Sequence, residues 1–193
     1  AMPKVGEMLD WMSAQFGDYP FEAFGYYSIE GVGASLETQT MVALSDPSLY
    51  VMAHEMAHMW FGDWVSLDTW GDMWRNEGFA TYIGEWAQTG QPPNTREWAD
   101  SVNSDPRQIQ LNQPPRGELF GMASYFKGAL VVNALRDELG EEAFLAGLRQ
   151  YFKEYGGGVA SHAQFQAALE GSSGKSLDPL FETWFSPAPV PVQ

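Results

Sequence analysis

The chain has 193 residues, a length that fits one domain or a compact domain with a small helical appendage. Ten Lys and Arg against 25 Asp and Glu give a formal net charge of −15, which disfavours nucleic acid and anionic membranes as partners. No cysteine is present, so disulfides contribute nothing and any metal site has to use imidazole and carboxylate ligands.

The first quarter of the sequence predicts one helix followed by a small sheet. Apolar residues recur at helical intervals over Val5–Phe16, and Gly17 follows as a C-terminal cap. An aromatic-rich run over Phe21–Ile29 and a run with alternating β-branched residues over Leu36–Leu44 predict two strands. We therefore expect an amphipathic surface helix and a small N-terminal β-sheet.

From Pro47 onward the predicted elements are almost entirely helical. One helix is expected to end at about Phe61, and a second to run from Asp72 to about Gln88. Two proline-rich breaks, at 91–94 and 113–117, are typical of loops and bracket a polar stretch expected to hold a helix and a loop. Glycine stops or breaks separate the remaining predicted helices, which are Ser124–Leu139, Glu141–Tyr155, Ser161–Leu169 and Leu177–Phe185.

Both ends of the chain carry expectations about what lies beyond them. Residues 187–193 are rich in proline and are expected to form a tail or linker, so the domain is expected to span residues 1–186. No segment approaches the length of a membrane span, and the first residues do not resemble a signal peptide. Ala1-Met2 resembles a cloning remnant or an internal cut, so a cytoplasmic and a secreted location both stay open.

His54 and His58 stand four residues apart on one predicted helix. Four residues advance about 6 Å and turn about 40° past a full turn, so both imidazoles point towards one place and can share a cation. Glu55 projects about 100° away from His54, where its carboxylate can take a proton from water without displacing an imidazole. We interpret His54 and His58 as metal ligands and Glu55 as a general base.

The predicted third ligand is Glu77, nineteen positions after His58 and on the next helix. A tetrahedral zinc site with two imidazoles takes one more protein ligand and keeps one position for water when it is catalytic. Asp63, Thr81 and Glu85 are candidates for orienting the imidazoles, because ligating histidines usually donate their other nitrogen to an oxygen.

Short patterns of this type also occur by chance in helices, but two of the three histidines of the chain fall in this one. The third, His162, lies between Ser161 and Gln164, which predict a capping box. It is therefore expected to be a surface residue of a first helical turn, without a catalytic role.

The segments His54–Asp63 and Trp74–Tyr82 resemble the aminopeptidase N family of zinc metallopeptidases, which are of the gluzincin type. The resemblance extends to Tyr125–Ala129 and Tyr19–Phe21, and only the tail lies outside it. It implies an α+β fold: a thermolysin-like catalytic domain with a small N-terminal β-sheet followed by a mainly α-helical part. It also implies Zn²⁺ as the cofactor.

The resemblance implies two further site residues. Tyr125 matches the family's tyrosine, whose phenol donates a hydrogen bond to the oxyanion; an aromatic core residue at a helix start is the alternative. Glu37 matches the glutamate of the family signature Gly-x-Met-Glu-Asn, which binds the free amino group of the substrate. Because Leu36 and Thr38 stand where the signature has Met and Asn, an exposed strand glutamate is the alternative.

Together these residues predict a zinc-dependent aminopeptidase domain that hydrolyses amino-terminal peptide bonds of a peptide substrate. The resemblance also implies a β-sandwich domain that precedes this one in a longer chain. Two alternatives stay open. One is a zinc peptidase without strict amino-terminal preference, because the Glu37 signature is altered. The other is a metal-stabilised binding module that is inactive as an isolated domain.

Overall fold

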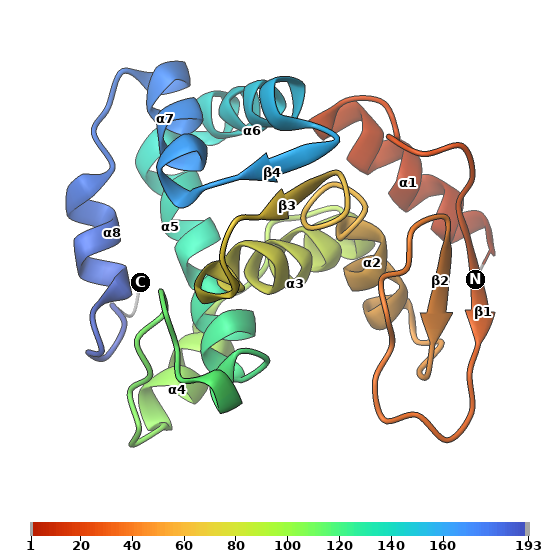
Figure 1. Ribbon diagram of the computed structural model, residues 1–193, viewed down its shortest axis with the longest axis horizontal. Helices are drawn as coiled ribbons and strands as arrows, with labels where there is room; N and C mark the ends of the chain where they lie inside the picture. The colour runs from red at the N-terminus through yellow and green to blue at the C-terminus, as the bar shows by residue number, and fades with distance from the viewer. Residues whose placement is uncertain (1, 192–193) are drawn as a thin grey trace.

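The computed structural model describes residues 2–191, and it begins with the predicted amphipathic helix. Helix α1 spans Met2–Phe16, and Gly17 ends it in the left-handed region with φ of 107°. Its apolar stripe is buried, with Met8 and Met12 at 1 % and 0 % exposure. In Figure 1 α1 lies at one end of the molecule, where it packs against α2, α3 and α6.

The predicted N-terminal sheet is present but its strands are shorter than expected. Strands β1 (Gly25–Ser28) and β2 (Met41–Leu44) pair in parallel, with Gly25 opposite Met41. The expected strand over Leu36–Leu44 is interrupted, because Thr40 has φ of 68° and the Thr38 hydroxyl donates to the carbonyl of Met41. Leu36 alone bridges to Ala43 on β2, in antiparallel fashion, so residues 35–37 lie along the edge of the sheet.

The expected strand over Phe21–Ile29 is also too long at its start. Residues 21–24 lie outside the strand, with a bend at 21–22, and the Tyr19 hydroxyl donates to the carbonyl of Ala23. A second parallel pair, β3 (Val65–Leu67) with β4 (Gly158–Ala160), was not predicted. Each of these strands has three residues, too few for a period-two pattern to stand out.

The helix that carries both histidines of the motif is shorter than predicted. Helix α2 spans Leu49–Ala57, begins at the side-chain cap Ser48 and has His58 as its C-terminal cap. The chain reverses there, since the amide of Asp63 donates to the carbonyl of His58 and Gly62 has φ of 127°. The expectation of a helix to Phe61 was therefore wrong by one turn.

Helix α3, which carries Glu77, spans Trp74–Thr89 and ends at Gly90 in the left-handed region. A short 3-10 helix, η1 (Trp70–Asp72), precedes it, so the predicted start at Asp72 was early. In Figure 1 α3 runs through the middle of the molecule, and it packs against α2, α5 and the segment before α5. Helix α3 therefore forms the central support of the fold.

The remaining elements complete a mainly helical part, as expected for the α+β class. The expected helix over Ser124–Leu139 divides into a π-helix, η3 (Ala123–Lys127), and α5 (Gly128–Leu139). Ser161 and Gln164 form the predicted capping box at the start of α7. The other elements are α4 (Arg96–Ser104), η2 (Arg116–Glu118), α6 (Glu141–Tyr155), α7 (His162–Ser173) and α8 (Asp178–Phe185).

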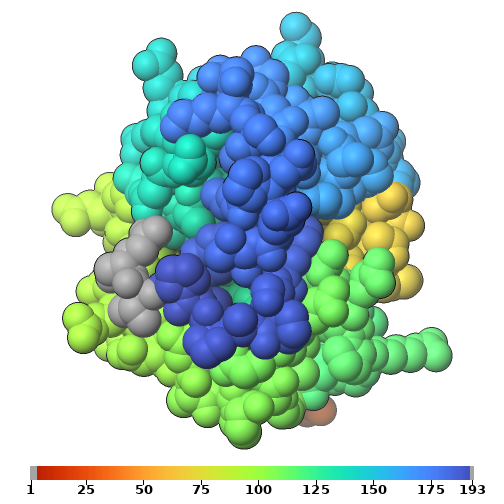
Figure 2. Space-filling view, turned by 90° about the vertical axis from the view of Figure 1, so that its left-hand side faces the viewer, coloured from red at the N-terminus to blue at the C-terminus, as the bar shows by residue number. Residues whose placement is uncertain are grey.

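The segment after α8 returns to the domain. Val190 is 5 % exposed, and its backbone amide and carbonyl both hydrogen-bond the side-chain amide of Asn103, at 2.7 and 3.1 Å. Figure 2 shows this segment lying over the region of α4. Val190, in the expected tail, therefore lies against the domain. The boundary at residue 186 stays a prediction, and residues 192–193 lie outside the described part.

Aromatic side chains fill the centre of the core. Phe16 makes edge-to-face contacts with Trp60, Phe61 and Phe152, which joins α1, the turn after α2 and α6. Trp74 and Phe79 of α3 are 0 % and 1 % exposed. Within residues 2–191, no helix is both long and apolar enough to cross a membrane.

Candidate metal centre and active site

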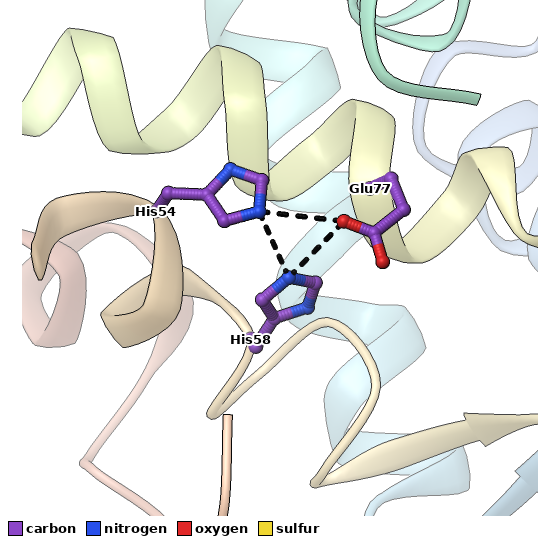
Figure 3. A group of neighbouring side chains, drawn as sticks. All are labelled: His54, His58 and Glu77. Carbon is purple, nitrogen blue, oxygen red and sulfur yellow. Dashed lines mark hydrogen bonds and ion pairs between the residues drawn. The ribbon is translucent and has the colours of Figure 1, made fainter. Parts of the chain in front are cut away.

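His54, His58 and Glu77 bring three ligand atoms together between α2 and α3 (Figure 3). The two Nε2 atoms are 3.2 Å apart, and Oε2 of Glu77 lies 3.3 Å from that of His54 and 3.5 Å from that of His58. All three residues are buried, at 9 %, 1 % and 3 % exposure. The spacing of the sequence motif thus brings the three predicted metal ligands to one point.

The geometry of this group fits a tetrahedral cation. Ligand atoms about 2.0–2.1 Å from a tetrahedral centre stand about 3.3 Å from one another, which is close to the three distances observed. Oε2 of Glu77 is fully buried and makes no well-directed hydrogen bond. A buried carboxylate oxygen that makes no hydrogen bond is costly unless a cation, such as a metal ion or a protonated imidazole, lies next to it. Two imidazoles with one carboxylate are also a donor set that zinc favours.

The ring of His58 is oriented by a backbone carbonyl. Its Nδ1 lies 3.0 Å from the carbonyl oxygen of Phe61, so Nδ1–H donates and Nε2 is the nitrogen that can bind a metal once it has lost its proton. Burial lowers the pKa of His58, but the adjacent Glu77 carboxylate outweighs burial and raises it to about 10. In His54 burial prevails and lowers the pKa. Without a cation, the proton of this group therefore resides on His58.

Glu55 is the predicted general base, and this residue of α2 is buried, at 6 % exposure. Burial raises its pKa to about 7; His58 opposes this effect, while Glu37, Glu77 and Asp63 add to it. A carboxyl group that titrates near neutrality can both accept and release a proton, which is what a general base followed by a general acid requires.

Tyr125 lies on the same side of the site. Its ring is stacked on the imidazole of His54, with centroids 5.8 Å apart and planes 15° apart. Burial raises the pKa of its phenol, and the negative charge of Glu77 raises it further, so the hydroxyl keeps its proton at neutral pH. The structure therefore places a hydrogen-bond donor beside the metal ligands.

Glu37 follows Leu36 at the edge of the N-terminal sheet. Its charge contributes to the raised pKa values of Glu55 and Tyr125, so it acts within electrostatic range of the metal group. Glu37 also lines a cavity of about 450 Å³ whose wall includes Asp63, Trp70 and Phe120. Among residues 2–191, no Lys or Arg lines this cavity, and its wall is acidic and aromatic.

In the described part of the chain, residues 2–191, none of the three residues predicted to orient the imidazoles hydrogen-bonds to His54 or His58. The hydroxyl of Thr81 is buried without a hydrogen-bond partner, and so is one carboxylate oxygen of Asp63. Glu85 is in electrostatic contact with Glu97 instead. Sequence reasoning missed the carbonyl of Phe61, because every residue has a carbonyl and only the chain reversal after α2 directs this one.

A close approach of α2 and α3 was also missed. A Cβ atom on Gly84 would lie 2.8 Å from the backbone nitrogen of His54. Gly84 is seven residues after Glu77, two helical turns on and about 20° away around the helix, so both face α2. A glycine inside an otherwise helical pattern is the signal that could have indicated this contact.

His162 takes no part in the metal group. Its ring lies against the aromatic rings of Trp74, Phe181 and Phe185 rather than facing solvent as expected. Its first-turn position at a capping box was predicted, but the cluster of α8 aromatics that covers it depends on tertiary packing.

Comparison with known proteins adds independent evidence. The model of the peptidase family M1 domain matches residues 36–184. The chain is 30 % identical to aminopeptidase N of Streptomyces lividans and 33 % identical to aminopeptidase M1 of Arabidopsis thaliana, over 95 % and 74 % of its length. It is also 28 % identical to the tricorn protease-interacting factor F2 of Thermoplasma volcanium. It spans 18–25 % of the length of these three relatives.

Solved structures agree with this result. A mutant M1 zinc metallopeptidase from Deinococcus radiodurans, bound to the substrate Tyr-Ser-Ala, superposes with a TM-score of 0.86 at 30 % identity. The match covers 96 % of this chain and 44 % of that protein. The region matched by the family model, residues 36–184, includes every residue of the metal group, Tyr125 and Glu37. The chain belongs to peptidase family M1.

Proposed function

We propose that this chain is the catalytic domain of a zinc-dependent aminopeptidase. The observation that carries the proposal is the convergence of His54, His58 and Glu77 within 3.2–3.5 Å, with Glu55 and Tyr125 beside them. Relatives named as aminopeptidases and structures named as zinc metallopeptidases support this assignment. Because the chain spans a part of these relatives, the activity of a whole protein of their length belongs to this proposal.

The roles of the residues follow from their chemistry. His54, His58 and Glu77 would hold the zinc ion. When bound, zinc supplies Lewis acidity towards the scissile carbonyl and the attacking water. Glu55 takes the proton of that water as it attacks, and Tyr125 donates a hydrogen bond to the oxygen that becomes negative. Glu55 then gives its proton to the leaving amine.

Preference for the amino terminus would reside in Glu37. A free α-amino group is mostly protonated, and so cationic, at neutral pH. Glu37 presents a carboxylate at the edge of the cavity of about 450 Å³. The peptide backbone can pair with the exposed edge at residues 35–37. The binding of the substrate Tyr-Ser-Ala to the structurally similar Deinococcus protein supports a short peptide as the substrate class.

Replacing Glu55 with Gln tests the proposed chemistry. The amide cannot accept a proton, so kcat should fall by about 10²- to 10⁴-fold while zinc remains bound. Turnover of an aminoacyl substrate and metal content are measured on the full-length protein. Glu182→Gln, an exposed change on α8, is the matched control and should leave both unchanged. Undiminished turnover in Glu55→Gln would refute the role of Glu55 as the base.

A further inference from the structure

Two helix backbones touch directly beside the metal group. A Cβ atom on Gly78 would lie 2.5 Å from the carbonyl carbon of Gly128 and 2.7 Å from its Cα. A Cβ atom on Gly128 would lie 3.0 Å from Cα of Gly78 and 3.1 Å from the carbonyl oxygen of Trp74. The start of α5 therefore approaches α3 more closely than side chains at these two positions would allow.

Each of these glycines is linked to a site residue through the backbone. Gly78 directly follows Glu77 on α3. The amide of Gly128 donates to the carbonyl oxygens of both Ala123 and Tyr125. The bond to Ala123 spans five residues and closes the wide turn of the π-helix. This conformation is rare in proteins overall, and where it occurs it is often at a functional site. The position of Gly128 thus fixes the position of Tyr125.

The Gly78–Gly128 contact joins the part of the fold that carries the metal group to the part that carries Tyr125. Helices α2 and α3 carry His54, His58 and Glu77, whereas η3 carries Tyr125, whose ring lies over His54. The separation between the phenol and the metal-binding atoms therefore depends on how closely η3 and α5 approach α3. The backbone contact between Gly78 and Gly128 is the point at which the approach is closest to steric limits.

We propose that the Gly78–Gly128 contact is a positioning device that sets the hydroxyl of Tyr125 against the metal site. The proposal rests on the proposed function, since it assigns Tyr125 the task of stabilising the oxyanion. A side chain at either position pushes η3 and α5 away from α3 and withdraws the phenol. The three metal ligands keep their arrangement, because none of them belongs to η3 or α5.

Gly128→Ala in the full-length protein is the principal test. The atoms around its new Cβ have to move away by only a few tenths of an ångström, so we expect the variant to fold. We expect kcat to fall about 3- to 10-fold with KM within about threefold, because a misplacement of about 1 Å can cost about 100-fold and the shift needed here is a few tenths of an ångström. Zinc stoichiometry should stay unchanged. Gly78→Ala, which is sterically more severe, should lose more.

Two control variants separate positioning from general destabilisation. Gly147→Ala is comparably crowded, since its Cβ atom would meet the Leu169 side chain at 2.7 Å, but it lies where α6 packs on α7 and neither helix carries a site residue. It should lower the thermal midpoint without lowering kcat. Gly6→Ala on α1 meets no described atom within 4 Å and should leave kcat unchanged, with a thermal midpoint equal to or above that of the wild type because alanine favours the helix. A fall in kcat of Gly147→Ala equal to that of Gly128→Ala would overturn the proposal.

A double-mutant cycle with Tyr125→Phe asks whether Gly128 acts through Tyr125. In the Tyr125→Phe background, Gly128→Ala should cost less than about twofold in kcat, since the phenol hydroxyl is already gone. Independent, multiplicative losses would overturn the proposal. The affinity of a phosphinic dipeptide analogue, measured by calorimetry, should follow the same cycle and does not require turnover. A zinc-loaded wild type that cleaves no aminoacyl substrate would refute the proposed function, while the analogue would still report the position of Tyr125.

A structural measurement decides the matter if Gly128→Ala does not fold. In the zinc-loaded wild type with the phosphinic analogue bound, Oη of Tyr125 should lie within about 3 Å of a phosphinyl oxygen, with the Gly78–Gly128 contact intact. A Tyr125 turned away from the analogue, or an open contact between the two glycines, would overturn the proposal.

Discussion

Protons and the metal compete for the same atoms at the residue scale. In the metal-free group His58 holds a proton, because Glu77 raises its pKa to about 10, whereas the lowered pKa of His54 leaves that ring neutral. A metal requires the lone pair on Nε2 of both rings. Glu77, with its pKa lowered to about 2 mainly by the opposing histidines despite its burial, is already ionised.

Zinc binding at neutral pH should therefore release about one proton, and that proton comes from His58. The apparent affinity should rise about tenfold per pH unit between pH 6 and 8, where the folded metal-free protein holds the proton and the complex does not. Calorimetric titration in buffers of different ionisation enthalpy gives the number of protons released. Affinity independent of pH over this range would show that His58 is neutral before zinc binds.

The same residues explain what could be predicted. The side chains of His54 and His58 meet as predicted, because four residues on a helix bring side chains to one face whatever the surrounding fold. Glu77 was found because helix α3 had to return past α2. The partner of His58 could not be found in this way: the carbonyl of Phe61 reaches it through a chain reversal at Gly62 that carries no residue-specific pattern.

At the scale of elements, α3 sets the geometry by touching its neighbours at glycines. Gly84 brings its backbone against that of His54, so the distance between the imidazole and Glu77 depends on a residue that contacts no metal. Local periodicity predicted α1, α6 and the start of α7 closely, since each is an amphipathic helix with its own cap. It failed for β3 and β4, which are held by pairing between distant segments.

Gly84→Ala should weaken metal binding. The added Cβ atom would lie 2.8 Å from the backbone nitrogen and 2.9 Å from the Cα of His54, so α2 has to move away from Glu77. We expect zinc affinity to fall at least about tenfold, in line with the effect of disturbing residues that support metal ligands. The visible spectrum of the cobalt-substituted protein should change as well. Gly171→Ala on α7, which has open space around it, is the control and should bind zinc normally.

At the scale of the whole molecule, the metal group links the two helices at the centre of the fold. A ligand that binds the folded chain and not the unfolded chain stabilises the fold. A free zinc concentration of about 1,000 times the dissociation constant therefore adds about 4 kcal/mol to the free energy of unfolding. For a domain of this size each kcal/mol shifts Tm by about 2–4 °C. Binding and fold stability are therefore measured by the same experiment.

Removing zinc with a chelator should lower Tm by about 8–16 °C. The Glu77→Gln variant, which loses one ligand, should start from the lower Tm and should not respond to the chelator. Calorimetric scans with and without chelator, together with metal analysis, measure both. An unchanged Tm after verified metal loss would mean that the three residues contribute no metal-linked stability.

The acidic surroundings of the site extend the argument to the substrate. The net charge of −15, the carboxylate of Glu37 and the absence of Lys and Arg from the cavity wall all favour a cationic amino terminus over an acetylated one. Whether the protein is an aminopeptidase thus depends on Glu37 more than on the metal ligands.

The most direct measurement is kcat/KM of the zinc-loaded full-length protein for one peptide with a free and with an acetylated amino terminus. We expect kcat/KM to be at least about 100-fold higher for the free peptide, and we expect Glu37→Gln to remove most of this difference. Glu30→Gln, an exposed change in the same segment, should leave it intact. Equal rates for both peptides in the wild type would contradict an aminopeptidase and leave a zinc peptidase without amino-terminal preference.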